Sequence, residues 1–270
     1  MLRRNLAKRL RALALMSFAG AACAQSPPRL LIFGEQHDQP DQQRQMAQAV
    51  AERAADGRLA AVVIEMAQAP YGTAGLPADA SEARVQQALH WHGWPWPAYA
   101  AVIMNAVRAG VPVWGGNLPG SRNHAAMNDA QLDARVPDAA RAVIADAVRE
   151  GHCNLLPQDQ LGGMVRIQIA RDQSLAQVVD DAMRRAEPPQ QVLLLTGAQH
   201  ASRDRGVPLQ LLAQGRWQPD QIRVVMFNDD AGLAADERRA ATVTPQPDRC
   251  AALRRRLHGA SAPATAAATP

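Results

Sequence analysis

Long apolar runs are missing from this sequence, and aromatic side chains are scarce at 4% of its 270 residues. The apolar run from Leu13 to Ala22 is too short to cross a bilayer, and no later run is longer than a buried strand or helix face requires. The chain therefore has the composition of a globular protein with one short apolar segment near its N-terminus.

The N-terminal segment has the three parts of a secretory signal peptide. Five basic residues lie before or at the start of the apolar run, which ends in the small residues Ala22-Cys23-Ala24. We expect residues 1–24 to be a signal peptide cleaved after Ala24; an amphipathic first helix of the folded domain is the alternative. Lipidation of Cys23 is a second route of processing, and only this route would attach the protein to a membrane. The expected location is the periplasm, or the outer membrane as an anchored lipoprotein that faces the periplasm.

A surplus of basic residues is also missing once this segment is set aside. The formal net charge of +4 arises because the first 24 residues carry five of the 29 basic side chains and none of the 25 acidic ones. The rest of the chain has 24 basic and 25 acidic side chains, so no basic stripe indicates a nucleic-acid partner.

Cysteine is rare, and only Cys153 and Cys250 follow the signal segment. Two such cysteines usually pair in an oxidising compartment, so we expect a Cys153–Cys250 disulfide. Two buried free thiols are the alternative.

Short apolar runs alternate with helical patterns along the chain. The predicted strands are 30–33, 61–64, 111–114, 192–195 and 222–227, and the predicted helices are 41–55, 81–90, 98–109, 138–150 and 158–185. Several of these strands are continuously apolar, as strands buried on both faces are. The alternation predicts an α/β fold with a mainly parallel sheet flanked by helices. One domain is expected over residues 25–259, with a helical insertion or subdomain at about 117–190, and residues 260–270 have the composition of a disordered tail.

Polar side chains follow three of the predicted strands. Glu35 and His37 follow the first, Glu65 ends the second, and His200 follows the fourth. Because ligands bind at the carboxyl ends of the strands in such sheets, we expect these four residues to share one pocket. His37 and His200 are candidate ligands of a divalent metal, or the four groups act as a base with its orienting partners. The alternative is that both histidines only cap helices or satisfy buried turns.

A set of motifs, each weak alone, is specific in its order and spacing. The sequence resembles the ChaN-like haem-binding uptake family of the Tiki superfamily in Gly34–Asp38, Glu65-Met66, Trp94-Pro95-Trp96 with Tyr99, Gly110–Val113, Asn117-Leu118-Pro119, Gly151–Pro157, Gln168–Asp172 and Gly197–His200. The motifs extend from about Leu30 to Cys250. The sequence departs from the family at Gln199 and Ala201, where a small residue and a valine are usual.

The resemblance implies an exported, often lipid-anchored protein that takes part in haem or iron uptake or storage and binds haem as its cofactor. It also implies kinship with hydrolases of the superfamily that use the same Glu and His turns, including erythromycin esterase-like enzymes and metal-dependent peptidases.

Haem iron accepts an axial His, Met, Cys or Tyr, and the lack of a Cys-x-x-Cys-His motif excludes covalent c-type attachment. Tyr99 follows a cluster of tryptophans that would offer a porphyrin a flat apolar face, and it is the candidate axial ligand; an ordinary core cluster is the alternative. His152 and Arg171 are further candidates, because an arginine can hold a propionate or a substrate carboxylate. A salt bridge within its own helix is the alternative for Arg171.

Three functions follow from these observations. The first is a haem-binding protein, in which a homodimer interface is one place for the iron ligand. The second is a metal- or His-dependent hydrolase that uses Glu35, His37, Glu65 and His200. The third is a periplasmic binding module for another apolar small molecule.

Overall fold

A computed structural model describes residues 28–228 and 232–260, with side chains described as far as residue 255. The predicted signal peptide and most of the predicted tail lie outside these residues. Within them, six strands form one sheet in the order β3-β2-β4-β1-β5-β6, and every neighbouring pair is parallel. The strands are β1 (Leu30–Glu35), β2 (Leu59–Gln68), β3 (Val113–Asn117), β4 (Gln191–Gly197), β5 (Ile222–Phe227) and β6 (Glu237–Arg239). The structure confirms the expected α/β fold.

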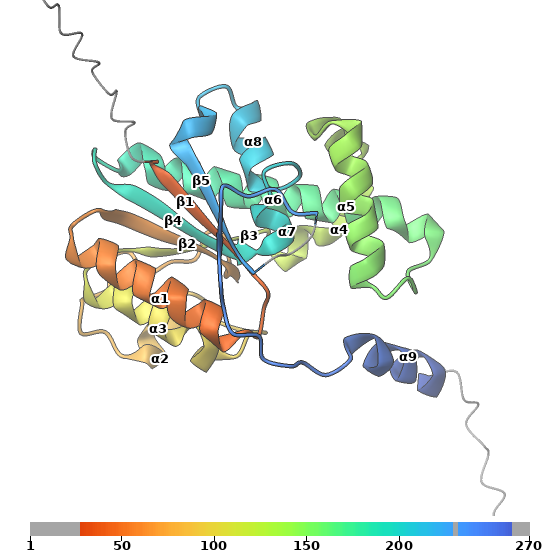
Figure 1. The fold of residues 1–270 in the computed structure, drawn as a ribbon, viewed down its shortest axis with the longest axis horizontal. Helices are drawn as coiled ribbons and strands as arrows, with labels where there is room; N and C mark the ends of the chain where they lie inside the picture. Colours follow the sequence, from red (N-terminus) through yellow and green to blue (C-terminus); the bar gives the residue numbers. More distant parts are fainter. Residues whose placement is uncertain (1–27, 229–231, 261–270) are drawn as a thin grey trace, which may run out of the picture.

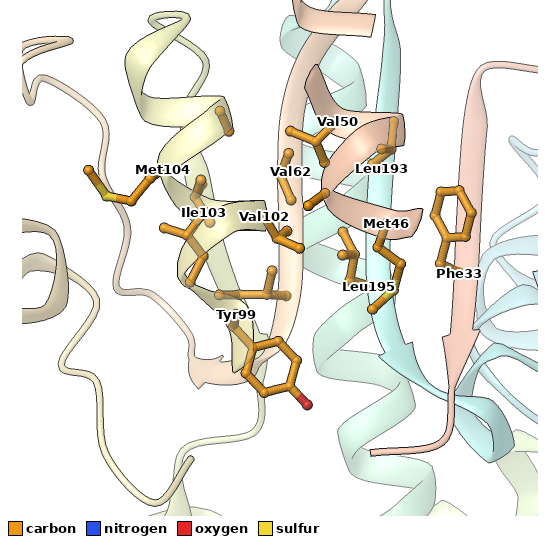
Figure 2. Packing of buried hydrophobic residues seen from close by; sticks show 14 of the residues in the cluster. Phe33, Met46, Val50, Val62, Tyr99, Val102, Ile103, Met104, Leu193 and Leu195 are labelled. Atoms are coloured by element: carbon orange, nitrogen blue, oxygen red, sulfur yellow. The ribbon is translucent and has the colours of Figure 1, made fainter. Parts of the chain in front are cut away.

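Helices cover both faces of this sheet (Figure 1). One face carries α1 (Pro40–Ala55), α2 (Glu82–Ala88) and α3 (Trp96–Arg108), and the other carries α6 (Gln158–Arg185) and α8 (Val207–Ala213). Figure 2 shows the first layer, where Met46 and Val50 of α1 and Val102 of α3 pack against the strands. Burial on both faces explains why the apolar runs of β1 and β4 are continuous rather than alternating.

The segment between β3 and β4 is helical, as expected. It contains α4 (Asn123–Asn128), α5 (Asp138–Gly151) and α6, with short 3₁₀ turns η1 (Gly120–Arg122) and η2 (Ala130–Arg135). The 28-residue α6 is about 42 Å long. Its N-terminal half packs with α4 and α5 through Val165 and Ile169, and its C-terminal half packs on the sheet through Leu175 and Val179. The insertion is therefore joined to the sheet by one continuous helix.

Several elements differ from the sequence-based expectation. β6 pairs with β5 but consists of three charged residues, so no apolar run marks it. The strand expected at 111–114 begins only at Val113, and the helix expected at 81–90 ends at Ala88, since His90 has a positive φ of 47°. The short helix α7 (Ala198–Ala201), the 3₁₀ turn η3 (Pro219–Gln221) and α9 (Arg249–Ala260) were not predicted.

The structure contains the expected disulfide between Cys153, which follows α5, and Cys250 in the first turn of α9. The bond joins residues 97 positions apart in the sequence and ties the C-terminal segment to the helical insertion. No helix in the described part of the chain is long and apolar enough to span a membrane.

Candidate functional site

A cavity of about 620 Å³ opens at the carboxyl edge of the sheet, beyond the ends of β1, β2 and β4. The predicted site residues Glu35, His37, Glu65 and His200 all line it, and so do His152 and Arg171. The parallel register places the end of β1 beside the end of β4, with Glu35 opposite Gly197. Helices α5 and α6 form the facing walls, where Ile144, Ala147 and Val148 supply apolar surface.

Glu35 organises the first group of side chains. Its Oε1 atom accepts hydrogen bonds from the Tyr99 hydroxyl at 2.6 Å and from Nδ1 of His37 at 2.9 Å. Because a carboxylate only accepts, Nδ1 of His37 carries a hydrogen, and in the neutral form of the ring Nε2 is the nitrogen that keeps the lone pair. Nε2 makes no hydrogen bond to the described residues, and the ring lies 4.6 Å from Trp94, centroid to centroid. His37 therefore presents an oriented and available nitrogen beside an indole ring.

Glu65 lies within β2, which continues to Gln68 rather than ending at Glu65 as the sequence suggested, and it directly follows Ile64, the last residue of β2 that pairs with β4. Its Oε2 atom accepts hydrogen bonds from the Thr196 hydroxyl and the Gly197 backbone N–H, both at 2.7 Å. Burial alone would raise the pKa of this carboxyl, but His200, His37 and the two hydrogen bonds outweigh burial and lower the pKa to about 2. Glu65 is thus a fixed negative charge under the cavity.

His200 lies in α7, directly after β4, and it pairs with a residue of α6. Its Nδ1 atom is 2.7 Å from Oδ1 of Asp172, and its Nε2 atom is 3.8 Å from Oε1 of Glu65. Burial lowers the pKa of His200, yet the charges of Asp172 and Glu65 raise it to about 9. His200 is accordingly a buried imidazolium at neutral pH, which makes it a donor rather than a base or a metal ligand.

The pKa of His37 is raised less strongly. Burial lowers it, but the hydrogen bond to Glu35 and the charges of Glu65 and Glu35 raise it above its ordinary value. Its side chain is 24% exposed, against 10% for His200. Of the two histidines at the strand ends, His37 is the one that a ligand in the cavity can reach.

Two buried polar atoms of the cavity residues lack a partner. These atoms are Oε2 of Glu35 and Nε of Arg171. Unpaired buried polar atoms are costly, and a ligand that accepted from Arg171 would relieve part of this cost. On the facing wall, Nδ1 of His152 is 2.7 Å from the Val148 carbonyl oxygen and donates to it, so its Nε2 is the nitrogen left for another group.

Tyr99 does not line the cavity as the sequence suggested. The residue is only 2% exposed, and it packs between α3 and the sheet with its hydroxyl committed to Glu35. Burial and the charge of Glu35 raise its pKa above the ordinary value, so the hydroxyl keeps its proton. In this structure Tyr99 is a support for Glu35 rather than a group presented to a ligand.

The metal site expected at His37 and His200 is not formed in the described residues. No group of three or more His, Cys, Asp or Glu side chains in the described ranges is arranged to hold a metal ion. The physical reason is that His200 carries a proton where a metal would bind, which leaves Nε2 of His37 as the one candidate nitrogen of this pair.

Sequence reasoning left most of the other lining residues unassigned, and four of them bear on the chemistry of the cavity. Asp172 and Trp94 stood within the quoted motifs, but neither was assigned to the site. Gln246 and Arg249 come from the C-terminal segment, where no motif marks them. The available signal was Cys250, because its disulfide to Cys153 brings the preceding residue, Arg249, to the same cavity as His152.

Comparisons with known proteins relate the chain to a sequence family. A sequence profile described as haem-binding uptake, Tiki superfamily, ChaN matches residues 23–211, well over half of the chain. A comparison with curated proteins gave no match.

Solved structures share the fold. A structure of cofacial heme binding to ChaN of Campylobacter jejuni matches with a TM-score of 0.60 and 21% identity, over 74% of this chain and 82% of that chain. A mutant of the erythromycin esterase EreC in its open conformation matches with a TM-score of 0.43 and 14% identity, over 74% of this chain and 70% of that chain. The type III effector HopBA1 matches with a TM-score of 0.37 and 12% identity, over 76% of this chain and 79% of that chain. The likeness to the first structure supports the fold, and the other two superpositions are too weak to add to it.

Proposed function

From the premise that this chain belongs to the haem-binding uptake family of the Tiki superfamily, which includes ChaN, we propose that it is an exported haem-binding protein of haem or iron uptake or storage. The proposal places the haem in the cavity at the carboxyl edge of the sheet. One observation carries it: this cavity combines an oriented histidine nitrogen, an apolar wall and a guanidinium with an unpaired buried nitrogen.

The residues of the cavity suit a porphyrin. A volume of about 620 Å³ falls within the range of small-molecule and cofactor sites, about 300–1,000 Å³. Trp94, Ile144 and Val148 offer apolar surface to the ring, and Arg171 offers an unpaired buried Nε to a carboxylate. Haem bound there would supply the iron that the protein stores or passes on.

We propose His37 as the axial ligand, in place of Tyr99. Iron-ligating histidines commonly donate their other ring N–H to a carboxylate or carbonyl group, which fixes the tautomer and raises the basicity of the ligating nitrogen. His37 has this arrangement with Glu35, and Tyr99 supports Glu35 from behind. His152, whose Nδ1 donates to a carbonyl, is available on the facing wall.

The test is a titration of the purified protein, without residues 1–24, with hemin. We expect a saturable shift of the Soret band with a defined stoichiometry. A spectrum that is only the sum of protein and free hemin would contradict the proposal. Sedimentation with and without hemin then tests the predicted homodimer.

Gly197 provides a prediction about the placement of His37. A Cβ atom added at Gly197 would lie 2.9 Å from Nε2 of His37, closer than real Cβ contacts allow without a shift. We expect Gly197→Ala to displace the imidazole and weaken hemin binding about tenfold. This value is the lower end of the loss in affinity that follows when a residue supporting a ligand is changed. Hemin titration measures this. Gly162→Ala is the matched control, because this glycine of α6 has open space around it, no positive φ and no place in the cavity lining.

Export is part of the proposal, and the observed Cys153–Cys250 bond supports it, because disulfides persist in oxidising compartments. N-terminal sequencing of the protein from a periplasmic extract should begin at Gln25. A blocked Cys23 would indicate the lipoprotein form instead. Functional protein that retained Met1 would contradict export.

Hydrolysis is the second candidate, and one observation favours it: Nε2 of His37 is available while Glu35 holds Nδ1. In that reaction Nε2 takes a proton from water while the water oxygen bonds to an ester carbonyl carbon. The ring then returns the proton to the departing alcohol oxygen as the ester bond breaks. An aryl acetate tests this candidate, and turnover that His37→Ala leaves unchanged would argue against it.

A further inference from the structure

The C-terminal segment 240–250, called here the C-terminal strap, forms part of the cavity wall. Figure 1 shows it leaving the sheet and running as an extended segment to α9. Gln246 and Arg249 of the strap line the cavity. The family match ends at residue 211, so these two residues lie outside it.

Side chains of the β1–α1 turn hold one end of the strap. Gln39 makes two hydrogen bonds to the backbone of Thr244, donating to its carbonyl oxygen at 3.0 Å and accepting from its N–H at 2.8 Å. The Gln246 amide donates to the Asp38 carbonyl oxygen at 2.7 Å. These contacts fix the strap beside His37, since Asp38 follows it directly.

The disulfide holds the other end. Cys250 is bonded to Cys153, which is adjacent to His152 on the opposite wall of the cavity. The strap therefore connects the sheet edge to the helical insertion across the cavity, and Arg249 lies immediately before the anchored cysteine.

Arg249 is exposed, and it makes no hydrogen bond or ion pair to the described residues. The acidic groups of the cavity, by contrast, already have partners: Glu35 pairs with His37, Glu65 with Gly197 and Thr196, and Asp172 with His200. A guanidinium with unused donors at the rim of a cavity is suited to a carboxylate at the solvent-facing end of a ligand.

We propose that the C-terminal strap is a component of the ligand site, in which Arg249 binds an anionic carboxylate of the ligand and the Cys153–Cys250 disulfide holds Arg249 in place. This inference rests on the proposed haem-binding function and adds a specificity element to it. Arg171 and Arg249 together would contact a ligand that carries two carboxylates. Loss of the disulfide releases the strap and with it the carboxylate contact.

The experiment compares hemin with hemin dimethyl ester, which lacks free carboxylates, by absorbance titration of the full chain without residues 1–24. We expect Arg249→Ala to weaken hemin binding about tenfold, as loss of a charge-assisted hydrogen bond does, and to leave binding of the ester unchanged. Cys250→Ser should give the same pattern. Arg255→Ala is the matched control, an exposed arginine of the same helix that does not line the cavity.

The outcomes separate the two proposals. If the unmodified protein fails to bind hemin, the proposed function falls and this inference falls with it. If it binds hemin and neither Arg249→Ala nor Cys250→Ser changes the affinity, only this inference is overturned. Equal losses for hemin and the ester would also overturn it, because they would indicate a structural role. A melting curve of Cys250→Ser checks that this variant is folded at the temperature of the titrations.

Discussion

Replacing His37 by alanine should weaken hemin binding at least about 100-fold while the protein stays folded. The expected loss exceeds the 10–100-fold range for outer-shell partners, because the substitution removes the iron ligand itself. His37 is partly exposed and lies outside the buried core, and Tyr99 still donates to the buried Glu35 in the variant, so the protein should stay folded with only a small decrease in melting temperature. Hemin titration and a melting curve of the same sample measure both effects.

Two variants give this prediction its controls. His124→Ala removes an exposed histidine of α4 that hydrogen-bonds to Asn128 and does not line the cavity, and it should bind hemin as the unmodified protein does. Tyr99→Phe keeps the buried ring and removes only its hydroxyl from Glu35, so it should weaken binding about tenfold. The reverse result, a lost spectrum in Tyr99→Phe and an intact one in His37→Ala, would make Tyr99 the ligand.

Replacing Asp172 by alanine should lower the free energy of unfolding by about 3 kcal/mol, because it removes one partner of a buried ion pair. Asp172 is 3% exposed, and its partner His200 would be left with only the more distant Glu65. Urea denaturation at pH 7 measures the change. Asp181→Ala on the same helix is the control, because its pair with Arg184 is largely solvent-exposed and should contribute less than about 1 kcal/mol.

The pH dependence of this effect follows from His200. Its pKa is raised from 6.5 to about 9 in the folded state by the charges of Asp172 and Glu65, while burial raises the pKa of Asp172 to about 6, so both partners of the ion pair are charged between these two values. The stabilisation by this pair is lost as the pH rises through about 9. The difference in stability between the unmodified protein and Asp172→Ala should therefore shrink between pH 6.5 and pH 9. A difference that stays constant over this range would show that His200 is neutral in the folded protein.

The sequence was sufficient to predict which residues lie at the carboxyl edge of the sheet. Continuous apolar runs identify the buried parallel strands, and the residues that follow these runs lie at that edge. Glu35 ends β1, His200 follows β4, and Glu65 follows the last residue of β2 that pairs with β4, so parallel pairing leaves little freedom in their placement. Asp172 could not be found in this way, since it reaches the cavity from the middle of α6. Helix registry relative to a sheet depends on packing that no local pattern specifies.

The burial of Tyr99 could have been predicted from the helical periodicity of the sequence around it. Counting from Tyr99, the helical spacings of three, four, seven and eight lead to apolar residues, and all four are buried with it in α3. This periodicity places Tyr99 on the core face, not on the cavity side. Its neighbour Trp94 precedes the helix, and nothing in the helical period constrains the direction of that side chain.

The order of the strands also affects how the chain folds as it is made. β1 is the first strand to be synthesised, yet it lies between β4 and β5, with Leu30 paired to Val192 on one side and Ile222 on the other. Such non-local pairing gives a high contact order, and chains of this kind fold slowly. One edge of this buried strand stays unpaired until β4 has been made and the other until the ribosome has passed Phe227, and unpaired edges invite aggregation. The nascent chain therefore requires protection, by chaperones or by remaining unfolded, for most of its synthesis.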